Sequence, residues 1–211
     1  MLHGCGGPWK RWGDGWSRWL VEWGYVVLQP NSFGARDYPK GVCHLPHTIG
    51  PLRRVAGAFT AKAYLEGLRY MDKTRIAVLS MSHGGWTIMY AVQNQFDDQP
   101  MRPNPLAAAV AIYPYCVHQV ARLDAPLLIL IGAADDWTHA DRCKQMKVIG
   151  PPEGTRPHEL TLKIYPGAHH GFDVPGVDFE VMGHTMKYDP VAAQDAIQQV
   201  WRFLAKHLNK M

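Results

Sequence analysis

Five short stretches of the chain are mostly apolar and rich in branched side chains. They are Tyr25–Gln29, Ile76–Ser80, Ala109–Tyr113, Leu127–Ile131 and Leu160–Tyr165. A strand with one face in water alternates between apolar and polar residues, whereas a strand of a parallel sheet is covered on both faces and reads as a continuous apolar run. The pattern therefore predicts five buried strands of a mostly parallel sheet.

Segments with apolar residues at helical spacing separate these strands. We predict helices over Gly15–Trp23, Pro51–Met71, Gly84–Gln95, Ala140–Val148 and Pro190–Leu208. Strands that alternate with helices form a parallel sheet with helices on both faces. The 211 residues, 47% of them apolar, suffice for one domain with a substantial core. We expect a single three-layer α/β/α sandwich over residues 1–211, with Val174–Tyr188 as an irregular excursion before the last helix.

Ser82 lies in a sharp turn between a predicted strand and a predicted helix. The segment Ser80-Met-Ser-His-Gly84 follows an apolar run directly, and a helical segment begins at once. This context is typical of a nucleophile elbow, in which small residues two positions before and after the serine let the turn close. Ser80 stands where the general pattern has glycine. Because serine alone is a weak nucleophile, this interpretation requires a base, an acid that orients it and an oxyanion hole.

Carboxylates and histidines follow two later strands. Asp135 and Asp136 come after the fourth predicted strand, and His169 and His170 come after the fifth. The chain order Ser–Asp–His is that of the α/β-hydrolase triad. We favour Asp135 over Asp136 because it stands three residues past the strand-ending glycine, and His170 over His169 because it directly precedes Gly171-Phe172. In this interpretation His170 removes the serine proton, and Asp135 holds the imidazole in the required tautomer.

A glycine-rich loop, His3-Gly-Cys-Gly-Gly7, opens the chain. Loops of this kind supply one oxyanion-hole donor, and the residue after the nucleophile supplies the other. We therefore expect the backbone N–H groups of Cys5 and His83 to hold the oxyanion. The alternative for the loop is a flexible glycine-rich N-terminus.

Further segments extend these motifs into a family resemblance. Gly24–Gly34, Ile131–Thr138 and Tyr165–Phe172, with the two loops above, resemble the dienelactone hydrolase family of α/β hydrolases over nearly the whole chain. The founding members of that family have a cysteine nucleophile where this chain has Ser82. The resemblance therefore implies a serine esterase or lactonase that needs no cofactor, and not hydrolysis of dienelactone itself.

The resemblance also implies a strand ahead of the glycine-rich loop. In the family's fold this strand lies between the strands at Tyr25–Gln29 and Ile76–Ser80, yet the sequence begins two residues before the loop. We expect an N-terminal truncation, or else direct pairing of those two strands. The localisation is accordingly open: cytoplasmic as written, and periplasmic or secreted if a signal was lost with the N-terminus.

Aromatic and basic residues near the loops are candidates for the substrate pocket. Five tryptophans recur at helical spacing, which is typical of a helix face packed on the sheet: Trp9, Trp12, Trp16, Trp19 and Trp23. Trp9 and Trp12 follow the oxyanion loop directly and are candidates for an acyl pocket, because Gly13 and Gly15 weaken the early helix. Arg36 is a candidate for contact with an anionic substrate, although a solvated arginine is the simpler interpretation.

Composition limits the classes of partner that the chain is expected to bind. A net charge of +4 without a basic cluster interleaved with aromatics argues against nucleic acid, and no apolar run approaches the length of a membrane span. The histidines form no complete ligand set, so we predict no metal. The cysteines lack a Cys-x-x-Cys pair, and we consider two disulfides, Cys5–Cys43 and Cys116–Cys143, against free thiols.

The predicted function is acyl transfer by Ser82. We expect cleavage of a small-molecule carboxylic ester or lactone through an acyl-enzyme, with no cofactor. A peptidase or an acyltransferase on the same triad is the alternative within enzymes. An inactive truncated member that acts as a binding module is the alternative outside them. The sequence does not indicate an oligomeric state.

Overall fold

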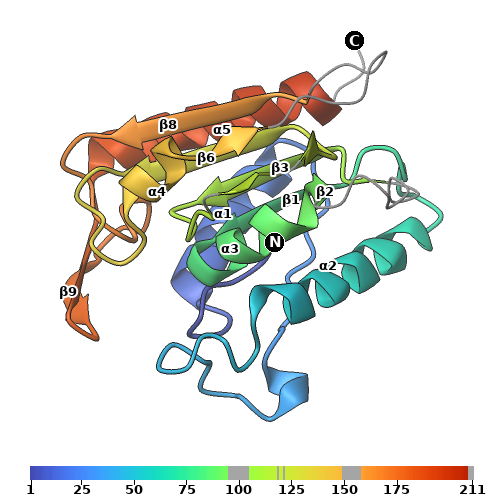
Figure 1. Ribbon diagram of the computed structural model, residues 1–211. Helices are drawn as coiled ribbons and strands as arrows, with labels where there is room; N and C mark the ends of the chain where they lie inside the picture. The colour runs from blue at the N-terminus through green and yellow to red at the C-terminus, as the bar shows by residue number, and fades with distance from the viewer. Residues whose placement is uncertain (95–104, 118, 121, 149–157, 209–211) are drawn as a thin grey trace.

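The computed structural model describes residues 1–94, 105–117, 119, 120, 122–148 and 158–208, and its centre is a parallel sheet (Figure 1). Four strands form it: β1 (Ala77–Met81), β3 (Ala108–Ile112), β6 (Leu127–Gly132) and β8 (Leu160–Tyr165). They lie in the order β1-β3-β6-β8, and each neighbouring pair is parallel. These strands match four of the five predicted runs to within one residue at each end.

The first predicted strand, Tyr25–Gln29, is not a strand of the structure, so that prediction is wrong. The segment does not pair with β1 either. Leu2 lies beside β1 instead: its N–H donates to the Leu79 carbonyl at 2.9 Å, and its carbonyl accepts from the Met81 N–H at 3.2 Å. The amino group of Met1 donates to the carbonyl oxygen of Leu28 at 2.6 Å. A groove of about 260 Å³ separates the rest of Tyr25–Gln29 from β1.

Helices cover both faces of the sheet. They are α1 (Lys10–Glu22), α2 (Pro51–Glu66), α3 (Ser82–Ala91), α4 (Ala140–Lys144) and α5 (Pro190–Leu208), with a 3-10 turn, η1, at Gly34–Arg36. Figure 1 shows α2 and α3 on one face and α1 and α5 on the other. The three-layer α/β/α sandwich is therefore confirmed. The predicted end of the third helix, Gln95, lies outside the described residues.

The α1 helix begins earlier than predicted and runs through both of its glycines. A Cβ at Gly13 would meet the amide end of the Gln29 side chain, which would have to move aside. Gly13 and Gly15 are thus accommodated within α1, although glycine lowers helix propensity.

The segment predicted as an irregular excursion contains a hairpin, so this prediction was incomplete. Strands β9 (Asp178–Val181) and β10 (His184–Lys187) are antiparallel, with Val181 opposite His184. The turn residues Met182 and Gly183 both have positive φ, 55° and 81°, as a tight primed turn requires. Two further pairs of short strands lie outside the central sheet: β2 (Gln93–Asn94) with β5 (Arg122–Leu123), and β4 (Gln119–Val120) with β7 (Lys147–Val148).

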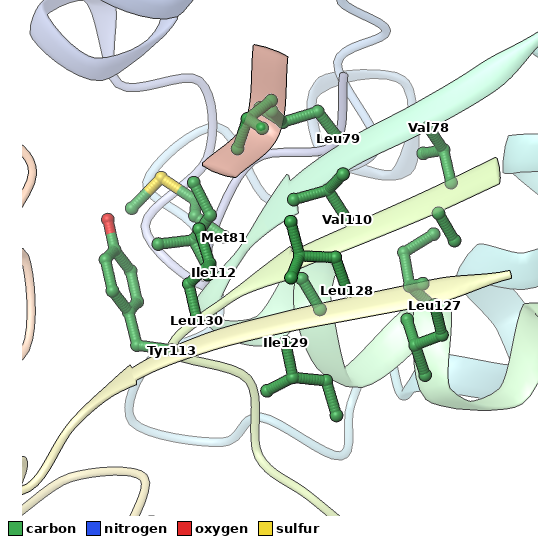
Figure 2. Packing of buried hydrophobic residues seen from close by; sticks show 14 of the residues in the cluster. Val78, Leu79, Met81, Val110, Ile112, Tyr113, Leu127, Leu128, Ile129 and Leu130 are labelled. Carbon is green, nitrogen blue, oxygen red and sulfur yellow. The ribbon is translucent and has the colours of Figure 1, made fainter. Parts of the chain in front are cut away.

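The core lies on both sides of the central strands. Every residue of β3 and β6 is buried, and Figure 2 shows side chains of β1, β3 and β6 packed above and below the sheet. Because all four strands are parallel, their carboxyl ends lie at one edge, where ligands bind in sheets of this kind. Within the described residues, no helix has the length and apolarity needed to cross a bilayer.

Candidate active site

Ser82 occupies a strained turn at the carboxyl end of β1. It is the first residue of α3 and has a φ of 49°, which is rare for a residue with a side chain. The turn packs tightly, since a Cβ at Gly84 would lie 2.5 Å from the carbonyl oxygen of Leu2 and 2.8 Å from that of His3. The strain and the close packing are the local features of a nucleophile elbow.

Asp135 and His170 form a buried hydrogen-bonded pair. The Nδ1 of His170 lies 2.8 Å from Oδ2 of Asp135. Because an ionised carboxylate only accepts, Nδ1 carries the proton and Nε2 has a free lone pair. The two loops meet closely: a Cβ at Gly132 would lie 2.0 Å from the carbonyl oxygen of Ala168. The structure therefore brings Asp135 and His170 together in the tautomer that a general base needs.

The surroundings of Asp135 keep its carboxylate ionised. Its Oδ1 accepts hydrogen bonds from the N–H groups of Trp137 and Thr138, at 2.9 and 2.8 Å. Burial alone would raise the pKa of Asp135, but His170 and these N–H donors outweigh burial and lower it. The neighbouring Asp136 points elsewhere and accepts from the N–H of Thr185 at 3.1 Å. The structure thus separates the roles of the two aspartates.

A second buried carboxylate supports the loop that carries His170. Asp173 accepts from the indole N–H groups of Trp12 and Trp16, at 3.0 and 2.7 Å, and from the hydroxyl of Tyr113 at 2.8 Å. The Tyr113 ring lies 4.4 Å from the His170 ring. Burial raises the pKa of Asp173. Trp12, a candidate pocket residue from the sequence, therefore serves this network and does not line the pocket around Ser82.

The glycine-rich loop lies against the elbow. A Cβ at Gly4 would lie 3.8 Å from Oγ of Ser82. The N–H of Cys5 has no backbone acceptor within the described chain, and the N–H of His83 belongs to the first turn of α3, where intrahelical acceptors are lacking. Both predicted oxyanion donors thus lie on segments that flank Ser82.

Two disulfides tie down the loops at this edge of the sheet. The structure forms Cys5–Cys43 and Cys116–Cys143, with Cα atoms 4.8 and 5.1 Å apart, and not the free thiols. The backbone holds the first pair together as well, because the Val42 N–H donates to the Cys5 carbonyl at 2.7 Å. Cys5, a predicted oxyanion donor, is therefore fixed from its side chain and from its backbone.

The pocket beside Ser82 and His170 is apolar. It measures about 250 Å³, and its other walls come from the glycine-rich loop, the first disulfide and large apolar side chains: Pro8, Trp9, Met81, Trp137, Phe179, Val181 and Met186. No lysine, arginine or carboxylate is among these residues. Arg36 does not line this pocket, and its guanidinium donates a hydrogen bond to the carbonyl of Ser32 at 2.5 Å. Of the three candidate pocket residues, Trp9 alone lines this pocket.

Several site residues had no motif in the sequence. Trp137 directly follows the two aspartates, which was a usable signal. Phe179, Val181 and Met186 come from the β9–β10 hairpin, where the sequence pattern predicts an irregular segment. Among the described residues, no group of three or more histidine, cysteine or acidic side chains is arranged to hold a metal ion.

Three buried residues lie together at the start of the glycine-rich loop: the guanidinium of Arg54 bonds to the ring of His83 and to the backbone carbonyl of His3. Nε2 of His3 accepts from the Ser32 N–H at 2.9 Å, so its Nδ1 carries the proton. Nδ1 of His83 accepts from Arg54 at 2.8 Å, so its Nε2 donates to the carbonyl of Pro46. Burial, and then the charge of Arg54, lower the pKa of each histidine to about 4.

These two histidines predict a loss of stability in mild acid. The unfolded chain takes up their protons near the ordinary pKa of about 6.5, whereas the folded chain resists protonation down to about 4. Their contribution is therefore complete above pH 6.5 and falls between pH 6.5 and 4, by up to ~1.4 kcal/mol per pH unit for each histidine. Urea unfolding at several pH values measures this slope.

A matched pair of variants isolates the effect. His83→Gln should lower the number of protons taken up on unfolding by about one, and so reduce the slope of the unfolding free energy against pH. His44→Gln, at an exposed position, should leave this slope unchanged. Equal slopes for the two variants would contradict the assignment.

The chain matches a known protein family over most of its length. A family model described as the dienelactone hydrolase family matches residues 13–208. No curated protein sequence matches the chain. A solved structure of a putative dienelactone hydrolase from Klebsiella pneumoniae is similar with a TM-score of 0.70 at 18% identity, covering 97% of this chain and 85% of that one.

Two other solved structures have the same fold. A dienelactone hydrolase-like promiscuous phosphotriesterase from metagenomic libraries gives a TM-score of 0.70 at 14% identity, covering 99% of this chain and 85% of that one. A monoacylglycerol lipase from Paleococcus ferrophilus gives 0.62 at 15% identity, covering 98% and 93%.

Proposed function

The chain belongs to the dienelactone hydrolase family, and from that premise we propose that it is a serine hydrolase that cleaves a carboxylic ester or lactone with an uncharged apolar group. The observation that carries the proposal is the 2.8 Å hydrogen bond between Asp135 and His170, because His170 lines the same pocket as Ser82. The family supports hydrolysis in general, and the residues of this site support the nucleophile and the substrate class.

The proposed mechanism is acyl transfer in two steps. Oγ of Ser82 attacks the ester carbonyl while Nε2 of His170 takes its proton, and Asp135 stabilises the imidazolium that forms. The carbonyl oxygen becomes an anion, which the N–H groups of Cys5 and His83 hold. The tetrahedral intermediate expels the alcohol, which receives the proton from His170. Water, activated by the same histidine, then hydrolyses the acyl-enzyme.

The pocket supports an uncharged apolar substrate group. Its described walls beyond Ser82 and His170 are apolar or aromatic, and no lysine or arginine is among them. A carboxylate placed there would lose its hydration without gaining a partner, which is unfavourable by several kcal/mol. This pocket therefore favours esters whose group bound there carries no charge.

Two esters of similar length test the substrate class. p-Nitrophenyl butyrate should be hydrolysed with a kcat/KM at least ~100-fold above that of mono-p-nitrophenyl glutarate, since each 1.36 kcal/mol is a factor of ten. The measurement is the initial rate of nitrophenolate release, corrected for spontaneous hydrolysis. Equal rates, or a preference for the charged ester, would rule out the uncharged class while leaving the serine mechanism standing.

A further inference from the structure

Arg54 is a charged side chain enclosed in the protein beside the proposed oxyanion hole. It lies in the first turns of α2, and only 1% of its surface is exposed. Its neighbour Arg53 is exposed, so the phase of the helix selects Arg54 for burial. Enclosing a cation is costly unless the surroundings compensate it, and a buried arginine therefore calls for an explanation.

Among the described residues, no carboxylate pairs with Arg54. None of the ion pairs within the described residues includes it. Its Nε is buried without a hydrogen-bond partner, and the ring of Phe33 faces its guanidinium carbon at 4.9 Å. Burial, and then the charge of Arg36, lower the pKa of Arg54 to about 9, which leaves the guanidinium protonated at neutral pH. The charge is thus held by neutral groups alone.

The two hydrogen bonds of Arg54 reach the two segments that carry the oxyanion donors. One guanidinium nitrogen donates to Nδ1 of His83 at 2.8 Å, and the other donates to the carbonyl of His3 at 2.8 Å. His83 has the second donor on its own backbone, and His3 stands two residues before Cys5. One planar, rigid group therefore bridges both segments.

We infer that Arg54 is a positioning residue that sets the separation and direction of the Cys5 and His83 N–H groups in the oxyanion hole. This inference rests on the proposed function. The disulfide and Val42 hold Cys5 from one side, and Arg54 holds the loop through His3 from the other. The positive charge of Arg54 also favours the anion that forms on the substrate's carbonyl oxygen, because the low-dielectric surroundings screen this charge only weakly.

The inference predicts an effect on the transition state and little effect on substrate binding. Arg54→Met keeps the length of the side chain but removes both hydrogen bonds and the charge. Misplaced oxyanion donors should lower kcat for p-nitrophenyl butyrate by roughly 10- to 100-fold, with KM within about twofold of the original. The same displacement should raise the inhibition constant of an alkylboronic acid by the same factor as kcat falls. Such an acid bonds to Ser82 Oγ as a tetrahedral anion.

Two measurements separate positioning from folding. Titration of active sites with a fluorophosphonate, allowed to react to completion, counts the folded enzyme, so that kcat refers to each active site. Lys62→Met removes another buried cation from the same helix, one that pairs with Glu66. It should leave kcat and boronate affinity unchanged per active site. A positioning role moves the boronate affinity in Arg54→Met alone, whereas a merely structural role lowers only the number of active sites.

The outcomes are decisive in each direction. Arg54→Met with the original kcat and boronate affinity per active site would overturn the inference. If this variant does not fold, Arg54→Lys replaces it: a single ammonium keeps the charge but cannot bridge both acceptors, so roughly a tenfold loss of kcat is expected. The original kcat per site in Arg54→Lys would also overturn it. Failure of the proposed function is distinct, because the unmodified protein would then lack ester hydrolysis altogether.

Discussion

Ser82→Ala is expected to lower kcat for p-nitrophenyl butyrate by roughly 10⁶-fold and to abolish fluorophosphonate labelling. The alanine side chain has no oxygen to form the acyl-enzyme, and the other triad members contribute little without the nucleophile. The substitution removes only the hydroxyl oxygen of Ser82 and leaves the backbone of the strained turn, with φ at 49°, unaltered. The fold should therefore persist. Steady-state kinetics and mass spectrometry of the labelled protein measure the two effects.

Ser80→Ala is the matched control. Ser80 is buried two residues away, and its hydroxyl donates to the carbonyl of Val110 at 3.0 Å. Loss of that bond costs about 1 kcal/mol of stability, but the variant should be labelled and active. If Ser82→Ala keeps its activity, the proposed nucleophile is wrong. If the folded, unmodified protein takes no label, the binding-module interpretation is favoured instead.

The sheet could be predicted from sequence because its central strands are covered on both faces. All residues of β3 and β6 are buried, so continuous apolar runs mark them. Tyr25–Gln29 shows the limit of that signal. It is an apolar run that lies across a groove from β1. Among the described residues, Leu2 bonds to the backbone of β1, and the amino group of Met1 bonds to the carbonyl of Leu28. The run is not buried either, since Val26 is 54% exposed. An apolar run therefore becomes a buried strand only where a neighbouring strand pairs with it and covers it.

The hairpin at Asp178–Lys187 shows a second limit. Its turn is Met182-Gly183, without the Asn-Gly or Asp-Gly pair that marks most two-residue turns. Without that cue the segment reads as irregular. The consequence reaches the site, because the pocket residues of this hairpin could not be anticipated.

The convergence of the triad residues follows from the topology, which the sequence did reveal. Parallel strands end at one edge, so Ser82, Asp135 and His170 were expected together once their strands were recognised. Arg54 is different, because it contacts residues 29 and 51 positions away in the chain. The sequence shows two adjacent arginines, and the helix phase that buries one of them depends on tertiary packing. Long-range contacts of this kind are set by the fold and not by local pattern.

Asp135→Asn is expected to lower kcat by roughly 10⁴-fold with little change in fold. Oδ1 of Asp135 accepts two backbone N–H groups, so the amide oxygen of asparagine must stay there. The amide NH₂ would then face Nδ1 of His170, where the carboxylate now accepts. His170 would have to accept at Nδ1 and carry its proton on Nε2, the nitrogen that must be free to take the proton of Ser82.

The control for this variant is the adjacent aspartate. Asp136 is bonded to the N–H of Thr185 on the hairpin and has no contact with the His170 ring among the described interactions. Asp136→Asn should therefore keep kcat within a few-fold, and circular dichroism should show both variants folded. A comparable loss in the two variants would mean that the carboxylates act through the local fold or charge. A loss confined to Asp135→Asn, at constant active-site count, would assign the effect to the tautomer of His170.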